Sequence, residues 1–303
     1  MNSPARPALL FPGQGSEAIG MSSGWEANPA WAATLEQAES FSGLPLRAWM
    51  SEGPEAALRA PLNAPLAGIA HSVGVYRAHR AAGMPLPIFA AGHSLGFYSA
   101  LVASGAVPLE AAMDLVKAVE NLCVPRFGDR TGMAFFIGLT ELELRTALVG
   151  RPDLALSNIN GKAQFTVSGS RPELEALVAE LAPQCLKAGL LPVRHPLHAP
   201  HMMPLVPEVT RRLARWTVGA MAFPVLSHVD GRPLRDAGQA WDEAIASIGL
   251  PVHWLEVVKG FGQEPVQLYE CGCGNQLANL TRWADRDRTV LSLQSAPQAG
   301  RWT

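Results

Sequence analysis

Short apolar runs alternate with longer stretches in which apolar residues recur at helical spacing. The first run, residues 7–11, ends at Pro12-Gly13, so it predicts a buried strand that enters a loop. A second run, residues 88–91, leads to Gly92 and predicts another buried strand. Helices are predicted at residues 63–82, 95–104 and 109–123. This order is typical of an α/β protein in which strands lead through glycine turns into helices.

The pattern changes between about residues 129 and 196. It predicts, in order, a strand at 132–138, a helix at 140–149, strands at 154–158 and 163–169, a helix at 171–182 and a strand at 186–194. This β-α-β-β-α-β order is typical of the ferredoxin-like arrangement. We therefore expect a small ferredoxin-like subdomain at residues 129–196. It would interrupt a large α/β domain with a parallel sheet, formed by residues 1–128 and 197–303. The second part of that domain is predicted to hold helices at 200–215, 239–247 and 252–262 and a strand at 266–269.

The composition fits a globular chain of one large domain or two linked ones. Of its 303 residues, 48% are hydrophobic and 17% are charged. Lys and Arg number 24 against 26 Asp and Glu, so the chain lacks the overall basic field that attracts nucleic-acid backbones. The sequence shows neither a signal peptide nor the roughly 18 consecutive apolar residues of a transmembrane helix. We expect a cytoplasmic protein that binds neither nucleic acid nor membranes.

The four cysteines are scattered, and only Cys271 and Cys273 lie close together. Their Cys-x-Cys spacing is not the Cys-x-x-Cys spacing of zinc or redox motifs, and no Cys/His pair has metal-ligand spacing. We therefore expect reduced core thiols, no metal and no bound cofactor.

The strongest local signal is Gly92-His93-Ser94-Leu95-Gly96. It follows a predicted strand and precedes a predicted helix, which is the context of the nucleophile elbow in α/β-hydrolase-like sheets. The glycines allow a sharp turn that presents Ser94, while amide groups at the start of the helix face the oxyanion that develops beside it. A glycine-rich turn without catalytic function is the alternative. We expect a nucleophilic Ser94 in an α/β-hydrolase-like large domain.

A serine hydroxyl needs an adjacent base, which is normally a histidine. His93 is expected to point away from Ser94, and His71 and His79 fall in a helical pattern typical of surface or core residues. The cluster His195-Pro-Leu-His198-Ala-Pro-His201 is held rigid by two prolines where the chain leaves the subdomain. Rigid placement suits a base, but composition leaves open which of the three histidines acts.

Several further motifs follow one another over about residues 7–293. They are Phe11-Pro12-Gly13-Gln14-Gly15-Ser16, Gly92-His93-Ser94-Leu95-Gly96, Gly132-Met133 through Gly138-Leu139, Ser157-Asn158-Ile159-Asn160-Gly161 with Val167-Ser168-Gly169, His198-Ala199-Pro200, Pro251-Val252-His253-Trp254, and Tyr269-Glu270 before Gly272-Cys273-Gly274. In this order they resemble the malonyl-CoA:acyl-carrier-protein transacylase family, which includes the acyltransferase domains of polyketide synthases. Each motif alone is weak, and their order is specific.

The resemblance implies that Ser94 is the acylated nucleophile and that His198 is its base, with His201 a bystander. It also implies roles for three backbone groups: two amides that form the oxyanion hole, at Gln14 and Leu95, and a carbonyl that orients the histidine, at Ser247. This arrangement is a Ser–His dyad without the acid of a Ser–His–Asp triad.

The sequence departs from the family in its acyl pocket. Relatives that use malonyl groups carry an arginine that pairs bidentately with the free carboxylate, and its position, 25 residues after Ser94, is Val119 here. A slip of one residue gives Ala118 or Glu120, neither of which is cationic. A carboxylate buried there without a partner would cost several kcal/mol. One alternative is that Arg126 or Arg130 reaches back into the pocket.

Two further departures favour an apolar pocket. Leu197 lies where relatives carry specificity residues such as Ser or Phe, and Phe97 replaces the Glu that commonly follows Gly-His-Ser-x-Gly. Asn160, in the Ser157–Gly161 motif, is also expected among the substrate-binding residues. Drift at positions that never contact substrate is the alternative explanation.

We therefore expect an enzyme that moves a non-carboxylated acyl group from a coenzyme A or carrier-protein thioester to an acyl carrier protein, through an acyl-serine. A hydrolase that clears acyl groups from carrier proteins in polyketide biosynthesis remains an alternative, as does a standard malonyl transacylase. An unrelated α/β-hydrolase esterase and a catalytically silent carrier-binding protein are alternatives of other classes.

Carrier proteins are acidic, so a docking face should be cationic. Arg211, Arg212 and Arg215 share one predicted helix, and Lys187 and Arg194 lie near the subdomain boundary. We expect these residues to contact the carrier protein. A solvated helix face is the alternative.

Overall fold

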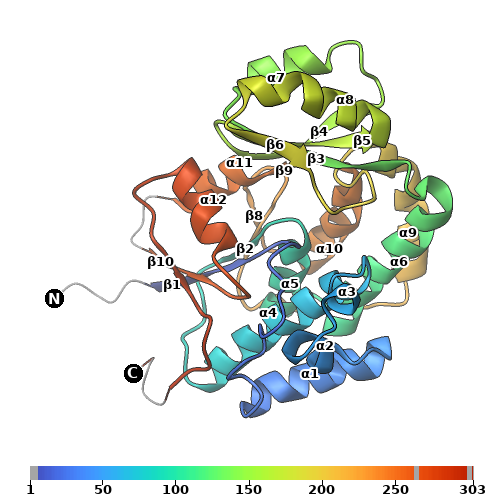
Figure 1. Ribbon diagram of the computed structural model, residues 1–303. Coiled ribbons are helices and arrows are strands. Elements are labelled where there is room, and N and C mark those ends of the chain that lie inside the picture. The colour runs from blue at the N-terminus through green and yellow to red at the C-terminus, as the bar shows by residue number, and fades with distance from the viewer. Residues whose placement is uncertain (1–5, 263–265, 299–301, 303) are drawn as a thin grey trace.

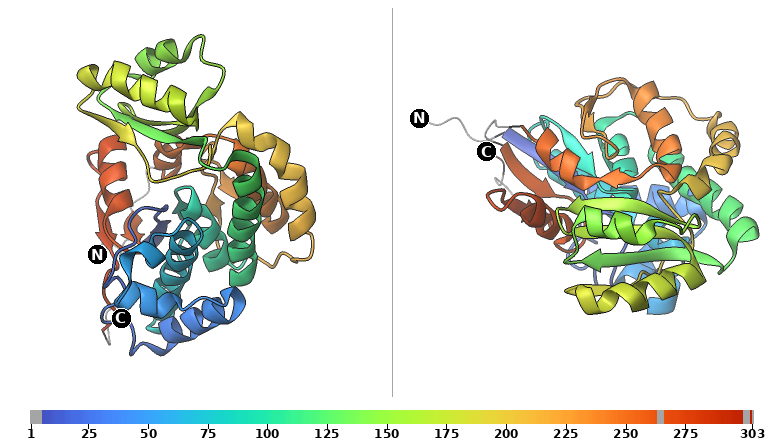
Figure 2. Two further views of the ribbon diagram at one scale, coloured as in Figure 1. Left: turned by 45° about the vertical axis from the view of Figure 1, so that its right-hand side comes forward. Right: turned by 90° about the horizontal axis from the view of Figure 1, so that it is seen from above.

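Two β-sheets form the framework of the protein, and helices cover both faces of the larger sheet (Figures 1 and 2). The computed structural model describes residues 6–262, 266–298 and 302. In Figure 1 the larger sheet and most of the helices lie in the lower part. The smaller sheet lies above them, with α7 and α8 on its outer face.

The larger sheet has the strand order β11-β10-β1-β2-β7-β8. Its strands are β1 (Arg6–Phe11), β2 (Ala90–Gly92), β7 (Val225–Leu226), β8 (Pro233–Leu234), β10 (Val266–Glu270) and β11 (Val290–Ser292). Neighbouring strands are parallel except β7 and β8, which are antiparallel. A parallel sheet of this kind is buried on both faces, which explains the uninterrupted apolar run of β1.

The side chains of β1 alternate between two cores, as the two-residue period of a strand requires. Leu9 and Phe11 join the core under α4 and α5, and Ala8 and Leu10 join the core under α11 and α12. The helices of this domain are α1 (Pro29–Ser42), α2 (Leu46–Ser51), α3 (Glu55–Leu58), α4 (Asn63–Ala81), α5 (Leu95–Ser104), α6 (Leu109–Phe127), α9 (Val206–Leu213), α10 (Ala237–Ala246), α11 (Trp254–Gly260) and α12 (Gln276–Ala284).

The smaller sheet has the strand order β6-β3-β5-β4-β9. Its elements in chain order are β3 (Thr131–Ile137), α7 (Glu141–Leu148), β4 (Leu154–Gly161), β5 (Gln164–Ser170), α8 (Arg171–Leu181), the 3₁₀ turn η1 (Ala182–Gln184), β6 (Lys187–Leu190) and β9 (Val252–His253). The first four strands pair antiparallel in the order fourth, first, third, second. This topology confirms the ferredoxin-like arrangement.

The predicted boundaries of the subdomain, residues 129 and 196, remain a prediction. The sheet itself takes its fifth strand from outside them, because β9 pairs parallel with β4 through Asn158 and Ile159. Ser168 of β5 also donates a hydrogen bond to the Leu197 carbonyl at 2.7 Å. The small sheet is therefore fastened to the segments that carry the candidate site.

Several element predictions need correction, mostly where prolines interrupt a helical pattern. The helix predicted at 200–215 is a 3₁₀ turn, η2 (Pro200–Leu205), followed by α9, because prolines lack the amide that a continuous helix needs. The helix predicted at 252–262 begins as strand β9 and becomes α11. The strand predicted at 186–194 ends early, with β6, and the rest forms a loop.

Within the described residues, no helix is long and apolar enough to cross a membrane, and no group of three or more His, Cys, Asp or Glu side chains is arranged to hold a metal ion. The four cysteines are unpaired with one another.

Candidate active site

Ser94 occupies the sharp turn between β2 and α5, with a φ of 52°. Two glycines make this turn possible. A Cβ on Gly96 would lie 1.9 Å from the Phe11 carbonyl oxygen, and a Cβ on Gly92 would lie 2.1 Å from the Gly96 carbonyl carbon. Both distances are far below contact, so no other residue fits either position. The chain thus forms a nucleophile elbow, as the spacing predicts.

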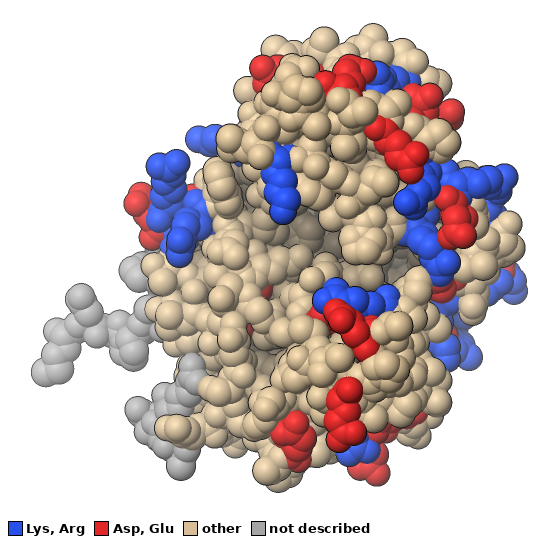
Figure 3. Space-filling model, in the orientation of Figure 1, with Lys and Arg blue, Asp and Glu red and all other residues tan. Residues whose placement is uncertain are grey.

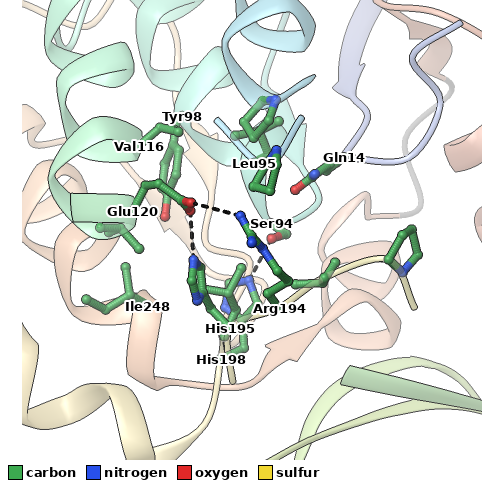
Figure 4. A pocket seen from close by; sticks show the side chains of 16 residues that line it. Gln14, Ser94, Leu95, Tyr98, Val116, Glu120, Arg194, His195, His198 and Ile248 are labelled. Carbon is green, nitrogen blue, oxygen red and sulfur yellow. Dashed lines mark hydrogen bonds and ion pairs between the residues drawn. The ribbon is translucent and has the colours of Figure 1, made fainter. Parts of the chain in front are cut away.

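His198 faces Ser94 from the segment that leaves the small sheet. Its Nε2 lies 2.6 Å from Ser94 Oγ (Figure 4). Its Nδ1 lies 2.8 Å from the Ser247 carbonyl oxygen. A carbonyl can only accept a hydrogen bond, so Nδ1 carries the proton and Nε2 is left to accept from the serine hydroxyl. The Ser247 hydroxyl donates to the Ala244 carbonyl instead, so the side chain at this position is not the group that orients His198.

Burial lowers the pKa of His198 to about 4. The ring is therefore neutral near pH 7 and free to take a proton. A second buried histidine, His228, meets it edge to face at 5.9 Å and stacks on Phe97 at 4.3 Å. Phe97 is fully buried in the core and is not among the residues that line the pocket described below, so its place among the substrate-binding residues stays a prediction without a contact to support it. Three residues into α5, its side chain turns toward the sheet rather than toward the serine.

The remaining candidate histidines have other partners. His93 Nε2 lies 2.7 Å from Asn160 Oδ1, so these two residues hold each other. His195 Nε2 lies 2.7 Å from Glu120 Oε2. His71 accepts a hydrogen bond from Trp31 in the core. Of the three clustered histidines, the one nearest the serine hydroxyl is thus His198.

A pocket with a volume of about 90 Å³ opens beside the dyad. It brings together predicted residues from distant parts of the chain: Gln14, Ser94, Leu95, Val119, Leu197 and His198. Helix α6 supplies Val116 along with Val119, and α5 supplies Tyr98 (Figure 4). Most of the lining surface is therefore apolar. Val119 and Ser94 line the same pocket, and the role of Val119 in substrate binding stays a prediction.

The pocket also contains an ion pair that the sequence did not predict, between Glu120 and Arg194. Glu120, at the position after Val119, accepts a hydrogen bond from His195, and its other oxygen lies 3.8 Å from Arg194 (Figure 4). Arg194, expected at a carrier-docking face, is exposed and also lines the acyl pocket. Glu120 follows from helical spacing, since Val116, Val119 and Glu120 share one face of α6. Arg194 lies in an irregular loop, so no periodicity signals it.

Neither arginine proposed to reach back from the end of α6 does so. Arg130 donates to the carbonyl oxygens of Arg126 and Phe127, and the Arg126 guanidinium packs over the Phe127 ring at 5.6 Å. Both side chains lie outside the residues that line the pocket.

A second, larger hollow of about 380 Å³ meets the first one at the dyad. It runs between the two sheets, and it is lined on the side of the small sheet by Met133, Phe135, Asn158 and Asn160. The space-filling view shows this hollow between the two parts of the molecule (Figure 3). Asn160, predicted to bind substrate, therefore lies in this groove and not in the acyl pocket.

The predicted docking arginines lie on or directly after α9, and each is exposed and paired. Arg211 and Arg212 form ion pairs with Glu208, and Arg215 pairs with Asp114 at 2.6 Å. Lys and Arg side chains gather on the right-hand side of the face in Figure 3, next to α6 and α9. Their charge is thus largely balanced by local carboxylates.

These features define a class of protein, the α/β enzymes in which a Ser–His pair stands at a nucleophile elbow between a parallel sheet and a ferredoxin-like sheet. Comparison with known proteins narrows the class. Residues 8–247 match the acyl transferase domain family. The chain is 31% identical to the malonyl CoA-acyl carrier protein transacylase of Salmonella typhimurium, with 91% of each chain covered. It is 32% identical to polyketide biosynthesis protein ThaF of Burkholderia thailandensis, over 97% of this chain and 25% of that protein.

Solved structures agree. The malonyl CoA-acyl carrier protein transacylase of Coxiella burnetii superposes with a TM-score of 0.88 at 29% identity, covering 97% of this chain and 96% of that one. A malonyl-transacylase solved in complex with a type II polyketide synthase acyl-carrier protein gives a TM-score of 0.87 at 29% identity, with 95% of each chain covered. The protein belongs to the acyl transferase domain family and is an acyltransferase of the malonyl-CoA:acyl carrier protein transacylase family.

Proposed function

We propose that the protein transfers a non-carboxylated acyl group from a coenzyme A or carrier-protein thioester to an acyl carrier protein, through an ester on Ser94. The observation that carries this proposal is Val119, an aliphatic side chain in the acyl pocket at the position where the family resemblance places the malonate-binding arginine. The Salmonella typhimurium and Coxiella burnetii relatives are named malonyl transacylases, so the proposed acyl group differs from the one in their names.

The dyad geometry supports an acyl-serine mechanism. His198 Nε2 takes the hydroxyl proton as Ser94 Oγ attacks the thioester carbonyl, and the Ser247 carbonyl holds the opposite ring nitrogen in its protonated form. The oxyanion forms next to the amide of Leu95, the first residue of α5, where helix amides have no partner within the helix. The amide of Gln14 is proposed as the second donor. His198 then protonates the departing thiol.

The pocket offers a substrate carboxylate little compensation, because Arg194, the one lysine or arginine among the described residues that line it, already lies near the carboxylates of Glu120 and Asp129. Val116, Val119 and Tyr98 present mainly carbon to the acyl chain, and an ionised carboxylate moved from water to such surroundings loses several kcal/mol unless a cation pairs with it. A neutral chain gains free energy from the same surface, at about 25 cal/mol per Å² of apolar area buried. The pocket thus favours neutral acyl groups.

The second reactant is proposed to enter through the larger groove. A phosphopantetheine arm is long and thin, and this groove reaches Ser94 and shares Gln14, Leu197 and His198 with the acyl pocket. We propose that Arg211, Arg212 and Arg215 contribute to the contact with the carrier protein. The similar transacylase solved with its carrier protein supports a partner of this kind.

Intact-protein mass spectrometry tests the proposal. The protein is incubated with malonyl-, acetyl- and butyryl-CoA at equal concentration, and the mass added at Ser94 is followed with time. We expect acetyl or butyryl loading to be at least about tenfold faster than malonyl loading, and preferential malonyl loading would contradict the proposal. The Ser94→Ala variant is the control for labelling at other sites.

A chase of the loaded enzyme separates transfer from hydrolysis. The acyl-enzyme is freed of excess acyl-CoA and is then mixed with buffer alone or with holo acyl carrier protein. If the enzyme loses its acyl mass only when the carrier protein is present, and the carrier protein gains the same mass, the result supports transfer. Equal loss in buffer alone would identify a hydrolase.

A further inference from the structure

Glu120 puts a carboxylate into the acyl pocket of an acyltransferase. The residue follows Val119 on α6, its side chain is 17% exposed, and it lines the pocket together with Ser94. Relatives that hold malonate need a positive charge in this region, whereas here the side chain beside the critical position is negative. Its role in the reaction is not explained by the dyad or by Val119.

Two side chains from one loop hold this carboxylate in place. His195 Nε2 donates a hydrogen bond to Glu120 Oε2 at 2.7 Å, and Arg194 Nη2 lies 3.8 Å from Glu120 Oε1. His195 is almost fully buried, so its hydrogen bond fixes the direction of the carboxylate. The carboxylate therefore occupies the pocket in a defined position rather than as a mobile surface charge.

The positive charge of this pocket, on Arg194, is also paired with carboxylates. Among the described residues that line it, the one lysine or arginine is Arg194. Its guanidinium faces Glu120 on one side and Asp129 on the other, at 3.4 Å from Asp129 Oδ1. Two carboxylates thus balance a single guanidinium. A substrate carboxylate that approaches Arg194 from inside the pocket meets the negative charge of Glu120 at short range, where like charges repel strongly.

We propose that Glu120 is a specificity-determining residue, which excludes carboxylated acyl groups by filling the pocket with a negative charge and by keeping Arg194 engaged. This proposal rests on the proposed function and deepens it, because it names an active repulsion in place of a missing attraction. Rejection of a competing substrate by a repulsive element is a common source of specificity. His195 acts through Glu120 and is a positioning residue.

The test compares malonyl-CoA with acetyl-CoA, which differ by the carboxylate alone. The ratio of their Ser94 acylation rates is measured for the wild type and for Glu120→Gln, which keeps an acceptor for His195 and removes the charge. We expect the malonyl-to-acetyl ratio to rise at least about tenfold. The double variant Glu120→Gln/Arg194→Gln also lacks the guanidinium that Glu120→Gln releases. We therefore expect its malonyl-to-acetyl ratio to lie between that of the wild type and that of Glu120→Gln.

Asp129→Asn is the matched control. It removes the other carboxylate that faces Arg194, but Asp129 is 79% exposed and lies outside the pocket lining. We expect it to change the ratio less than about twofold, because an exposed charge is screened by solvent. A rise as large as that of Glu120→Gln would overturn the proposal, since the location of the negative charge would then be immaterial.

Other outcomes also decide the matter. A Glu120→Gln ratio within about twofold of the wild type overturns the proposal and leaves the proposed function intact, whereas preferential malonyl loading by the wild type overturns the proposed function itself. If Glu120→Gln folds poorly, Glu120→Met replaces it. Calorimetric binding of malonyl-CoA and acetyl-CoA to Ser94→Ala, with and without Glu120→Gln, gives the same comparison without any chemical step.

Discussion

Ser94 and His198 are the two described residues other than glycine with a positive φ, 52° and 59°, and their side chains meet at 2.6 Å. The two residues lie 104 positions apart, on segments that enter the site from different directions. Such backbone conformations cost about 1–3 kcal/mol each and persist only where the surroundings impose them. The strain of this fold is therefore concentrated on the pair of residues proposed to perform the chemistry.

The first prediction concerns the proposed base. His198→Ala removes the acceptor for the serine proton, so we expect the acylation rate of Ser94 to fall at least about a thousandfold, in line with other Ser–His sites. The rate is measured by quenching the reaction at successive times and recording intact-protein mass spectra, with the acyl-CoA that loads the wild type fastest. His201→Ala is the matched control, because His201 lines neither pocket, and we expect its rate to stay within about threefold of the wild type. A comparable loss in both variants would argue against His198 as the base.

The second prediction uses the strain at Ser94. Alanine at this position keeps the unfavourable φ, whereas glycine adopts it freely, so Ser94→Gly should be more stable than Ser94→Ala by about 1 kcal/mol despite the greater freedom of glycine in the unfolded chain. Both variants lack the nucleophile, so catalysis does not complicate the comparison. Urea unfolding measures the difference. Equal stability, or a more stable alanine variant, would show that the turn is not strained.

Much of the scaffold was predictable because its signals are local. The Gly-x-Ser-x-Gly spacing fixes the elbow within five residues, and the β-α-β-β-α-β order fixes the small sheet. The partner of Ser94 was different: composition left three histidines open, and the family resemblance pointed to His198. A physical argument for His198 needs to know that its loop folds back onto Ser94, which lies 104 positions earlier in the chain, and no local pattern encodes this contact.

Two residues have surroundings that no local pattern predicted, and the reasons are physical. Phe97 directly follows the elbow in sequence, yet its place on α5 turns it into the core beside His228. Arg194 was expected at a docking surface because carrier proteins are acidic and this cation lies near the subdomain boundary; it is exposed, and it also lines the acyl pocket. Its backbone lies in a loop between two prolines, and the direction of its long side chain depends on Glu120, which comes from α6. Side-chain direction in an irregular segment is set by tertiary contacts.

The third prediction is the pH dependence of acylation. Burial lowers the pKa of His198 to about 4, so the ring loses its ability to accept a proton only when the pH falls toward that value. Between pH 7.5 and 5.5 we expect kcat/KM for acylation to change by less than about twofold, whereas a base with a pKa of about 6.5 would lose about tenfold. Circular dichroism at each pH verifies that the protein remains folded. An acid midpoint near 6.5 would contradict the buried, neutral base.

The fourth prediction concerns stability and another buried histidine. Burial lowers the pKa of His71 to about 4, so between pH 6.5 and 4 the unfolded state binds a proton that the folded state does not. Stability from this residue is therefore lost as the pH falls through that window, by about 2 kcal/mol at pH 5. In His71→Asn, which can still accept from Trp31, we expect this loss to be absent. Urea unfolding of both proteins at pH 7.5 and pH 5 measures it, and parallel losses would contradict the assignment.

The last prediction restores the missing cation. Val119→Arg places a guanidinium in the acyl pocket, so we expect it to raise the malonyl-to-acetyl loading ratio, by about threefold to tenfold, because Glu120 competes for the new charge. Combined with Glu120→Gln, the arginine is free to pair with the substrate, and we expect at least a further tenfold or so. Val124→Arg adds the same charge to an exposed position of α6 and is the matched control, with an unchanged ratio. An unchanged ratio in Val119→Arg, alone and combined, would show that this face of α6 does not meet the end of the acyl chain.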